Sequence, residues 1–160
     1  MEILWAPWRV KYIKKIKNKT CFLCEAIKEK TKRKKFVLIK TKKAISILNI
    51  YPYNNGHTLV APCRHIGSLE KLTSQEIEEI FSQINKVISA LKKAFKPSGF
   101  NLGLNIGKPA GAGLTSHLHI HIVPRWQGDT NFMPLLNSTK VMPQALEETY
   151  KEIKKNLCNE

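Results

Sequence analysis

The sequence has no long hydrophobic run and no signal-like N-terminus. No apolar stretch of this 160-residue chain approaches the roughly 20 residues that a membrane-spanning helix needs. The first nine residues lack the charged-then-apolar pattern of a secretory signal. We therefore expect a soluble, cytoplasmic protein without a membrane partner. With 42% hydrophobic residues, the chain can still bury the core of one domain.

Acidic residues are scarce. Only 12 Asp and Glu stand against 27 Lys and Arg, which gives a formal net charge of +15. Many of the cations crowd residues 9–43. A charge run is usually a solvated face, but it can also attract a polyanion such as a nucleic acid or a nucleotide with several phosphates. The charge alone leaves these readings open.

Cysteines are also few. Four of them cannot be read as a disulfide framework in a chain of this size and type. Cys21 and Cys24 have the Cys-x-x-Cys spacing, which indicates either a metal knuckle or a redox pair. We interpret Cys63 and Cys158 as ordinary thiols.

No internal repeat is present, and short apolar runs alternate with turn formers. These runs predict five strands and one long helix. Residues 21–30 could form a further, short helix. The strands are expected at residues 36–39, 44–48, 57–61, 100–106 and 116–126.

The long helix has the clearest pattern. Thr73-Ser-Gln-Glu76 is a capping box, and apolar residues then recur at steps of three and four up to Phe95. Pro97 would stop the helix after about 22 residues. A last helix can open at Pro143, where the apolar spacing resumes.

The order of these elements is strands, one long helix, then strands, which favours an antiparallel α+β domain over a wound parallel sheet. We expect a five-stranded antiparallel sheet with the long helix packed on one face and a C-terminal helix. One domain over residues 21–160 would follow an N-terminal arm over residues 1–20.

Three of the five histidines lie in one run, and this run is the strongest sign of a site. His117, His119 and His121 alternate with aliphatic residues. On a β-strand this alternation would put three imidazoles on one face and three aliphatic side chains on the other. Residues two apart on a strand lie roughly 6.6–7 Å apart, so three of them around a single ion would be awkward. One histidine held by a metal and another left for chemistry is the easier arrangement.

The run at residues 117–123 resembles the signature of the histidine triad (HIT) superfamily. Residues 54–65 resemble the family's Gly-His-x-Leu-Val-x-Pro segment, and Asn105 with the glycine-rich loop after it resembles its phosphate-binding turn. Further segments are similar to the branch that contains diadenosine tetraphosphate phosphorylases and related hydrolases. These are residues 4–9, 123–132 and 139–144.

The resemblance implies a HIT-like, dimer-forming domain and a HIT-type nucleotide hydrolase or adenylyltransferase (phosphorylase). Such an enzyme cleaves dinucleoside polyphosphates at the α-phosphate through a nucleotidyl-histidine intermediate. His119 resembles the nucleophile, and His121 would contact the phosphate or the leaving oxygen. His57 would support the histidine cluster.

The resemblance also implies the residues that bind the nucleotide. Asn49 would bind the ribose hydroxyls, and Asn105 would touch the phosphates, as would His121. Many relatives carry Gln or Ser in the loop before the triad, whereas residues 112–116 here read Ala-Gly-Leu-Thr-Ser. In this loop the expected contacts come from Gly113, Thr115 and Ser116.

Relatives with the cysteine knuckle hold structural zinc. The resemblance carries this role onto Cys21, Cys24, His65 and His117, which form a closed Cys₂His₂ set without an open ligand position. No organic cofactor is implied.

Other functions stay open at this point. The basic segment is compatible with a nucleic-acid-binding protein, and the family also contains nucleoside phosphoramidate and DNA-adenylate hydrolases. A zinc-dependent hydrolase with the triad as direct ligands of a catalytic metal is a further alternative.

Overall fold

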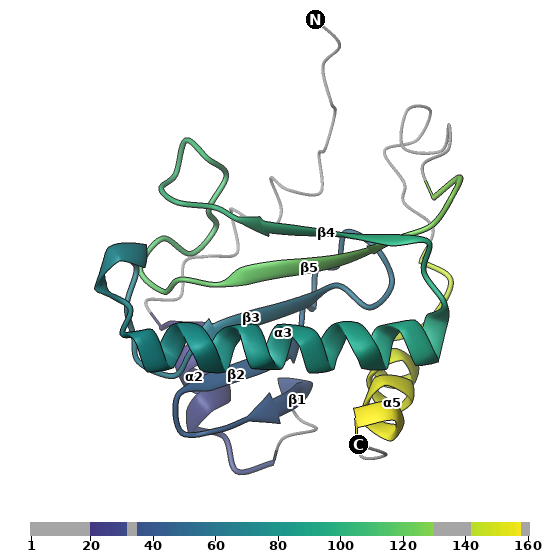
Figure 1. The fold of residues 1–160 in the computed structure, drawn as a ribbon, viewed down its shortest axis with the longest axis horizontal. Coiled ribbons are helices and arrows are strands. Elements are labelled where there is room, and N and C mark those ends of the chain that lie inside the picture. The colour runs from purple at the N-terminus through teal and green to yellow at the C-terminus, as the bar shows by residue number, and fades with distance from the viewer. Residues whose placement is uncertain (1–19, 32–34, 130–141, 158–160) are drawn as a thin grey trace, which may run out of the picture.

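A computed structural model of the chain describes residues 20–31, 35–129 and 142–157 (Figure 1). Five strands form one sheet in the order β1-β2-β3-β5-β4, and every neighbouring pair is antiparallel. The predicted α+β class and five-stranded antiparallel sheet are therefore confirmed. The arm predicted over residues 1–20 falls almost wholly outside the described residues. Within them, no helix is long and apolar enough to cross a membrane.

The strands lie close to the predicted ranges. They are β1 (Val37–Lys40), β2 (Ala44–Leu48), β3 (Thr58–Pro62), β4 (Gly99–Leu104) and β5 (Ile120–Arg125). Register puts Ile47, Leu59, His121 and Gly103 opposite one another across β2, β3, β5 and β4. Because directly opposed residues point to the same face, these four side-chain positions share one side of the sheet.

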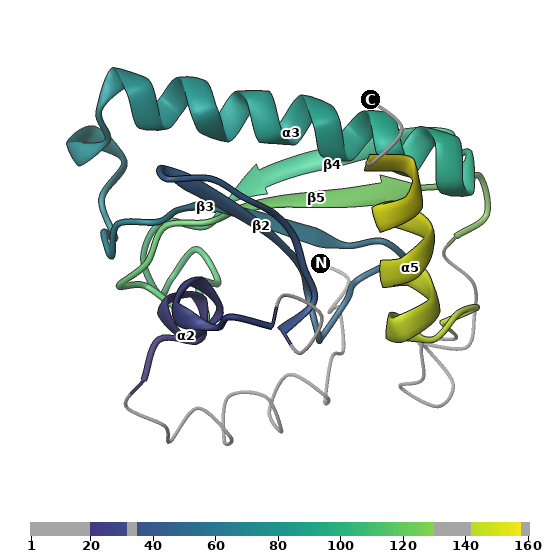
Figure 2. The same ribbon diagram turned by 90° about the horizontal axis from the view of Figure 1, so that it is seen from below.

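The two faces of the sheet are covered by different helices (Figure 2). On one face, α3 (Ser74–Phe95) and α5 (Leu146–Leu157) close a core that includes Val60, Ile122 and Ile153. On the other, the short helix α2 (Phe22–Lys28) covers a smaller cluster built on β1, β2 and β3. α2 does not reach over β4, so that half of the second face is left for a site.

The long helix begins as its sequence predicts. The Thr73 hydroxyl accepts from the Glu76 N–H at 3.2 Å, and the Glu76 carboxylate accepts from the Thr73 N–H at 2.9 Å. These two hydrogen bonds give acceptors to backbone N–H groups that the start of a helix would otherwise leave unpaired. Lys96, in the left-handed conformation at φ 47°, ends the helix before Pro97.

The histidine strand is shorter than predicted. β5 begins at Ile120, so His117 and His119 precede the strand and only His121 lies on it. The register that pairs Val60 with Ile120 would place Leu118 opposite Pro62, which has no N–H to donate. The Leu118 N–H instead donates to the Ile66 carbonyl at 2.7 Å. The prediction of one continuous strand through all three histidines is therefore wrong.

Other boundaries shift by a few residues. α5 begins at Leu146 rather than at Pro143, and α2 is shorter than residues 21–30. Gln144 accepts hydrogen bonds from Asn55 and Thr149, so this stretch pins a loop instead of opening the helix.

Gly56 seats the loop between β2 and β3 on the core. Its φ is 75°, a left-handed conformation that favours glycine. A Cβ at this position would lie 2.7 Å from Leu91 and 3.4 Å from Pro124. The next residue in the chain is His57, so this close approach determines where that imidazole lies.

Candidate functional site

His57 and His121 form a hydrogen-bonded pair with one possible proton order. The backbone N–H of Tyr53 donates to His57 Nδ1 at 3.0 Å, so this nitrogen is an acceptor and carries no proton. The proton of His57 therefore sits on Nε2, which donates to His121 Nδ1 at 2.9 Å. In its neutral form His121 must then carry its own proton on Nε2.

His119 lies beside this pair with the opposite tautomer. Its ring centroid is 5.0 Å from that of His121 and 6.5 Å from that of Phe22, whose ring is nearly perpendicular to it at an interplanar angle of 75°. Its Nδ1 donates to the carbonyl of His117 at 2.8 Å, because a carbonyl can only accept. This leaves the lone pair of the ring on Nε2. The side chain is 7% exposed, and burial lowers its pKa below the ordinary value, which favours the neutral ring.

His117 belongs to a separate group that we call the metal corner: Cys21, Cys24, His65 and His117. Their ligand atoms all lie within 4.8 Å of one another. Nε2 of His117 donates to the Pro62 carbonyl at 2.9 Å, so its bare Nδ1 faces the sulfur of Cys21 at 3.2 Å. His65 presents Nδ1 to the sulfur of Cys24 at the same distance. Two thiols and two imidazoles so arranged are placed to hold a metal ion.

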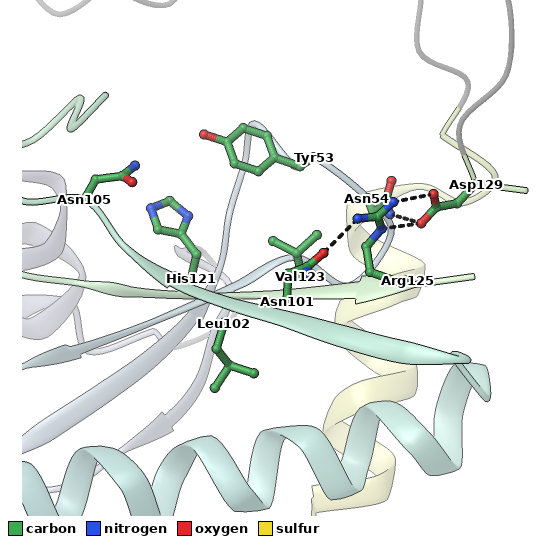
Figure 3. Close-up of a pocket in the computed structure, with 10 residues that line it drawn as sticks. Tyr53, Asn54, Asn101, Leu102, Asn105, His121, Val123, Arg125 and Asp129 are labelled. Carbon is green, nitrogen blue, oxygen red and sulfur yellow. Dashed lines mark hydrogen bonds and ion pairs between the residues drawn. The ribbon is translucent and has the colours of Figure 1, made fainter. Parts of the chain in front are cut away.

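A cavity of ≈ 390 Å³ opens next to His121, on the half of the face that α2 does not cover (Figure 3). Its walls come from β4, β5 and the loop before β3. They include Tyr53, Asn101, Gly103, Asn105, His121 and Arg125. The Tyr53 ring lies parallel to the His121 ring, with an interplanar angle of 5° and centroids 5.9 Å apart. A ligand in this cavity would therefore lie against His121.

A network of charged and amide groups closes the far end of the cavity (Figure 3). Arg125 donates to both carboxylate oxygens of Asp129, at 2.6 and 2.8 Å, and to Asn101 Oδ1 at 2.7 Å. Asp129 also accepts from Asn54 Nδ2 at 2.7 Å. The donated hydrogen bonds, the one from Arg125 above all, hold the pKa of Asp129 well below its usual range.

The residues expected to bind the nucleotide are spread over three places. We call His57, His119 and His121 the histidine cluster. Asn49 lies beside it, because its amide nitrogen is 3.3 Å from His57 Nδ1. Asn105 lines the cavity, whereas the lining does not include Gly113, Thr115 or Ser116. The structure also does not put His119 in the cavity lining.

No sequence pattern singles out Tyr53, Asn101, Arg125 or Asp129 as site residues. Their contacts join residues as far apart as Asn54 and Asp129, 75 positions along the chain. The pairing of β4 with β5, with Asn101 opposite Val123, and the pairing of β3 with β5 bring them together. The spacing of four residues between Arg125 and Asp129 is the one signal of this network that is local in sequence, and such a spacing alone does not indicate a site.

The chain matches the family profile described as the HIT domain over residues 30–128. It is 38% identical over 157 residues to a Mycobacterium tuberculosis protein named AP-4-A phosphorylase, with 93% of this chain and 80% of that relative covered. A Schizosaccharomyces pombe protein named bis(5'-nucleosyl)-tetraphosphatase (asymmetrical) is 36% identical over 93 residues. That match covers 58% of this chain and 50% of that relative.

Among solved structures, a hypothetical histidine triad nucleotide-binding protein of Sulfolobus tokodaii superposes with a TM-score of 0.69. The two chains are 30% identical, and the match covers 87% of this chain and 93% of that one.

Proposed function

This chain belongs to the HIT domain family, and from that premise we propose that it cleaves dinucleoside polyphosphates at the α-phosphate through a nucleotidyl-histidine. The names of the relatives above, a phosphorylase and a tetraphosphatase of such compounds, favour this substrate class. The observation that carries the proposal is the tautomer of His119. Because its Nδ1–H is held by the His117 carbonyl, the nucleophilic lone pair is on Nε2.

In the proposed reaction, His119 Nε2 attacks the α-phosphorus. A nitrogen–phosphorus bond forms and the bond from the α-phosphorus to the bridging oxygen breaks. The polyphosphate leaves as an anion, and its oxygen accepts a hydrogen bond from His121 Nε2–H. His57 Nε2 donates to His121 Nδ1 and so holds His121 in this tautomer. Water or inorganic phosphate then displaces the imidazole, which frees the nucleotide and restores His119.

Binding of the first nucleotide falls to the residues that the family resemblance names. Asn49 is proposed to bind the ribose and Asn105 the phosphates, with Gly113, Thr115 and Ser116 as further phosphate contacts. In support, Asn49 lies against His57 and Asn105 lies in the cavity wall beside His121.

We propose that the metal corner holds structural zinc. The donor set is two cysteine sulfurs and two imidazoles, four groups that would fill the usual coordination of zinc and leave no ligand position open for a reacting water. When bound, the ion would join α2 to the residues just before β5. The homodimer, which the resemblance implies, and the cytoplasmic location remain predictions.

The test is to incubate the protein with diadenosine tetraphosphate, with and without inorganic phosphate. ADP plus ATP formed only with phosphate indicates a phosphorylase, and AMP plus ATP formed without it indicates a hydrolase. Denaturing the enzyme early in turnover should trap an acid-labile, alkali-stable adenylate on His119, detectable by mass spectrometry. If neither condition yields a nucleotide product, the proposed function is wrong.

A further inference from the structure

The cavity lies on the far side of the histidine cluster from Asn49. The backbone N–H of Asn49 donates to the His57 carbonyl at 2.9 Å, which continues the pairing of β2 with β3. The strand order β2-β3-β5-β4 then puts Asn49 on one side of His121 and the β4 residues Asn101 and Gly103 on the other. A substrate that crosses the histidine cluster from the Asn49 side therefore runs into this cavity.

We infer that the cavity binds the second nucleoside of the substrate, the one that leaves with the rest of the polyphosphate. This inference rests on the proposed function and adds a subsite to it. With one ribose at Asn49 and the α-phosphate at His119, the leaving half extends over β5 toward β4. From His121 to Arg125 the strand covers roughly 13 Å, enough for a nucleoside beyond the phosphates.

The charge balance of the cavity suits a neutral ligand group. Its single guanidinium, on Arg125, is held by both oxygens of Asp129. Since the pair is close to neutral as a unit, the far end of the cavity offers little attraction to phosphates. It does offer amides and an aromatic ring, which are the groups that bind sugar hydroxyls and stack on a base.

The amide of Asn101 is held ready for such a contact. Arg125 donates to its Oδ1 at 2.7 Å, so the NH₂ end of the amide is the one that a ligand can use as a donor. Asp129 in turn fixes Arg125, and Asn54 donates to Asp129. Tyr53, 41% exposed, supplies aromatic surface next to His121 (Figure 3).

Gly103 keeps the floor of the cavity open. It is paired with His121, and a Cβ built on it meets nothing within 4 Å. A side chain here would occupy cavity space without a clash against the fold. Gly99, on the same strand and the same face, also has open space at its Cβ position, and it does not line the cavity.

The test compares two substrates that differ only by the second nucleoside, diadenosine tetraphosphate and adenosine 5'-tetraphosphate. We expect Gly103→Val and Asn101→Ala to lower kcat/KM for the dinucleotide by about tenfold, the equivalent of one lost contact of ~1.4 kcal/mol. Cleavage of adenosine tetraphosphate should change less than twofold. Gly99→Val is the matched control and should leave both substrates unaffected.

Three results would overturn the inference. One is an unchanged preference between the two substrates in both cavity variants. The second is an equal loss with both substrates, which would mean that the variants act on the chemistry at His121. The third is a wild-type enzyme that cleaves both equally well. If the wild type cleaves neither substrate, the proposed function fails instead, and the subsite with it.

Discussion

The metal corner and the histidine cluster each take one histidine from the same short segment, His117 and His119. The two rings present different nitrogens to their surroundings. His117 and His119 are both buried, and each donates one ring N–H to a backbone carbonyl. His117 uses Nε2 and so presents Nδ1 to the cysteines, whereas His119 uses Nδ1 and keeps its lone pair on Nε2. The difference shows that the nearest carbonyl, rather than the residue type, decides which ring nitrogen each histidine presents to its surroundings.

The sharpest way to break this comparison is to remove the proposed nucleophile. We expect His119→Ala to lower turnover of diadenosine tetraphosphate by roughly 10⁴-fold or more, because no other group could form the covalent intermediate. Metal content and the melting temperature should stay close to wild type, as measured by elemental analysis and thermal unfolding. Near-normal rates in this variant would refute the role of His119.

Loss of the metal ion should lower the stability of the metal corner more than it lowers turnover. Cys24→Ser removes one of the four ligands, so we expect loss of the bound ion and a melting temperature lower by about 10 °C, as α2 loses its tether. Turnover per folded molecule at low temperature should fall far less than in His119→Ala. Cys63→Ser is the matched control, because Cys63 lies outside the metal corner. Full retention of the metal in Cys24→Ser would contradict the assignment.

Substitution of His57 tests the proton order within the cluster. His57→Gln keeps a side chain of similar length but cannot accept at Nδ1 and donate at Nε2 as a ring does. We expect kcat to fall by about 10²-fold, the usual size of one lost donor to a developing oxyanion, because His121 would no longer be held with its proton on Nε2. Metal content should stay constant. An unchanged kcat would show that His57 does not set the tautomer of His121.

Glu76→Gln should spare both regions and so sets the baseline for a purely structural defect. Arg64 and the capping hydrogen bonds hold the pKa of Glu76 at about 2, with the bond from Arg64 the largest cause. This carboxylate stabilises the fold above its unfolded pKa of 4.5, and the contribution is lost as pH falls toward 2.

We expect Glu76→Gln to cost about 1–2 kcal/mol near pH 7 and to flatten the fall in stability between pH 4.5 and 2. Denaturant unfolding at several pH values measures both effects. If the variant unfolds with the same pH dependence as wild type, the Glu76 network is not what holds the start of α3.

Patterns local in sequence predicted the fold well. The capping box at Thr73 and the apolar spacing after it correspond to α3, and the alternation of apolar residues corresponds to the sheet. These features depend on residues a few positions apart. The start of β5 was missed because it depends on Pro62, which lies outside that strand and meets it only through register.

Site residues could be predicted from the sequence only where the residue type itself indicates a catalytic or metal-binding role. Histidines and paired cysteines carry that signal, and the family resemblance assigned their roles. Tyr53, Asn101 and Arg125 carry none, because tyrosine, asparagine and arginine are ordinary surface residues until a fold places them around one cavity. Their part follows from pairing across distant segments, as Asn54 with Asp129 illustrates.

The close packing of Gly56 against α3 couples the hydrophobic core to the position of His57. Leu91 and Phe95 project from α3 on the opposite face of the sheet, yet a Cβ on Gly56, the residue just before His57, would lie 2.7 Å from Leu91 and 3.6 Å from Phe95. Enlarging either side chain would push that loop outward and tilt the imidazole away from His121. Genetic screens for lost activity should therefore recover changes in the final turns of this helix in proteins that remain well folded.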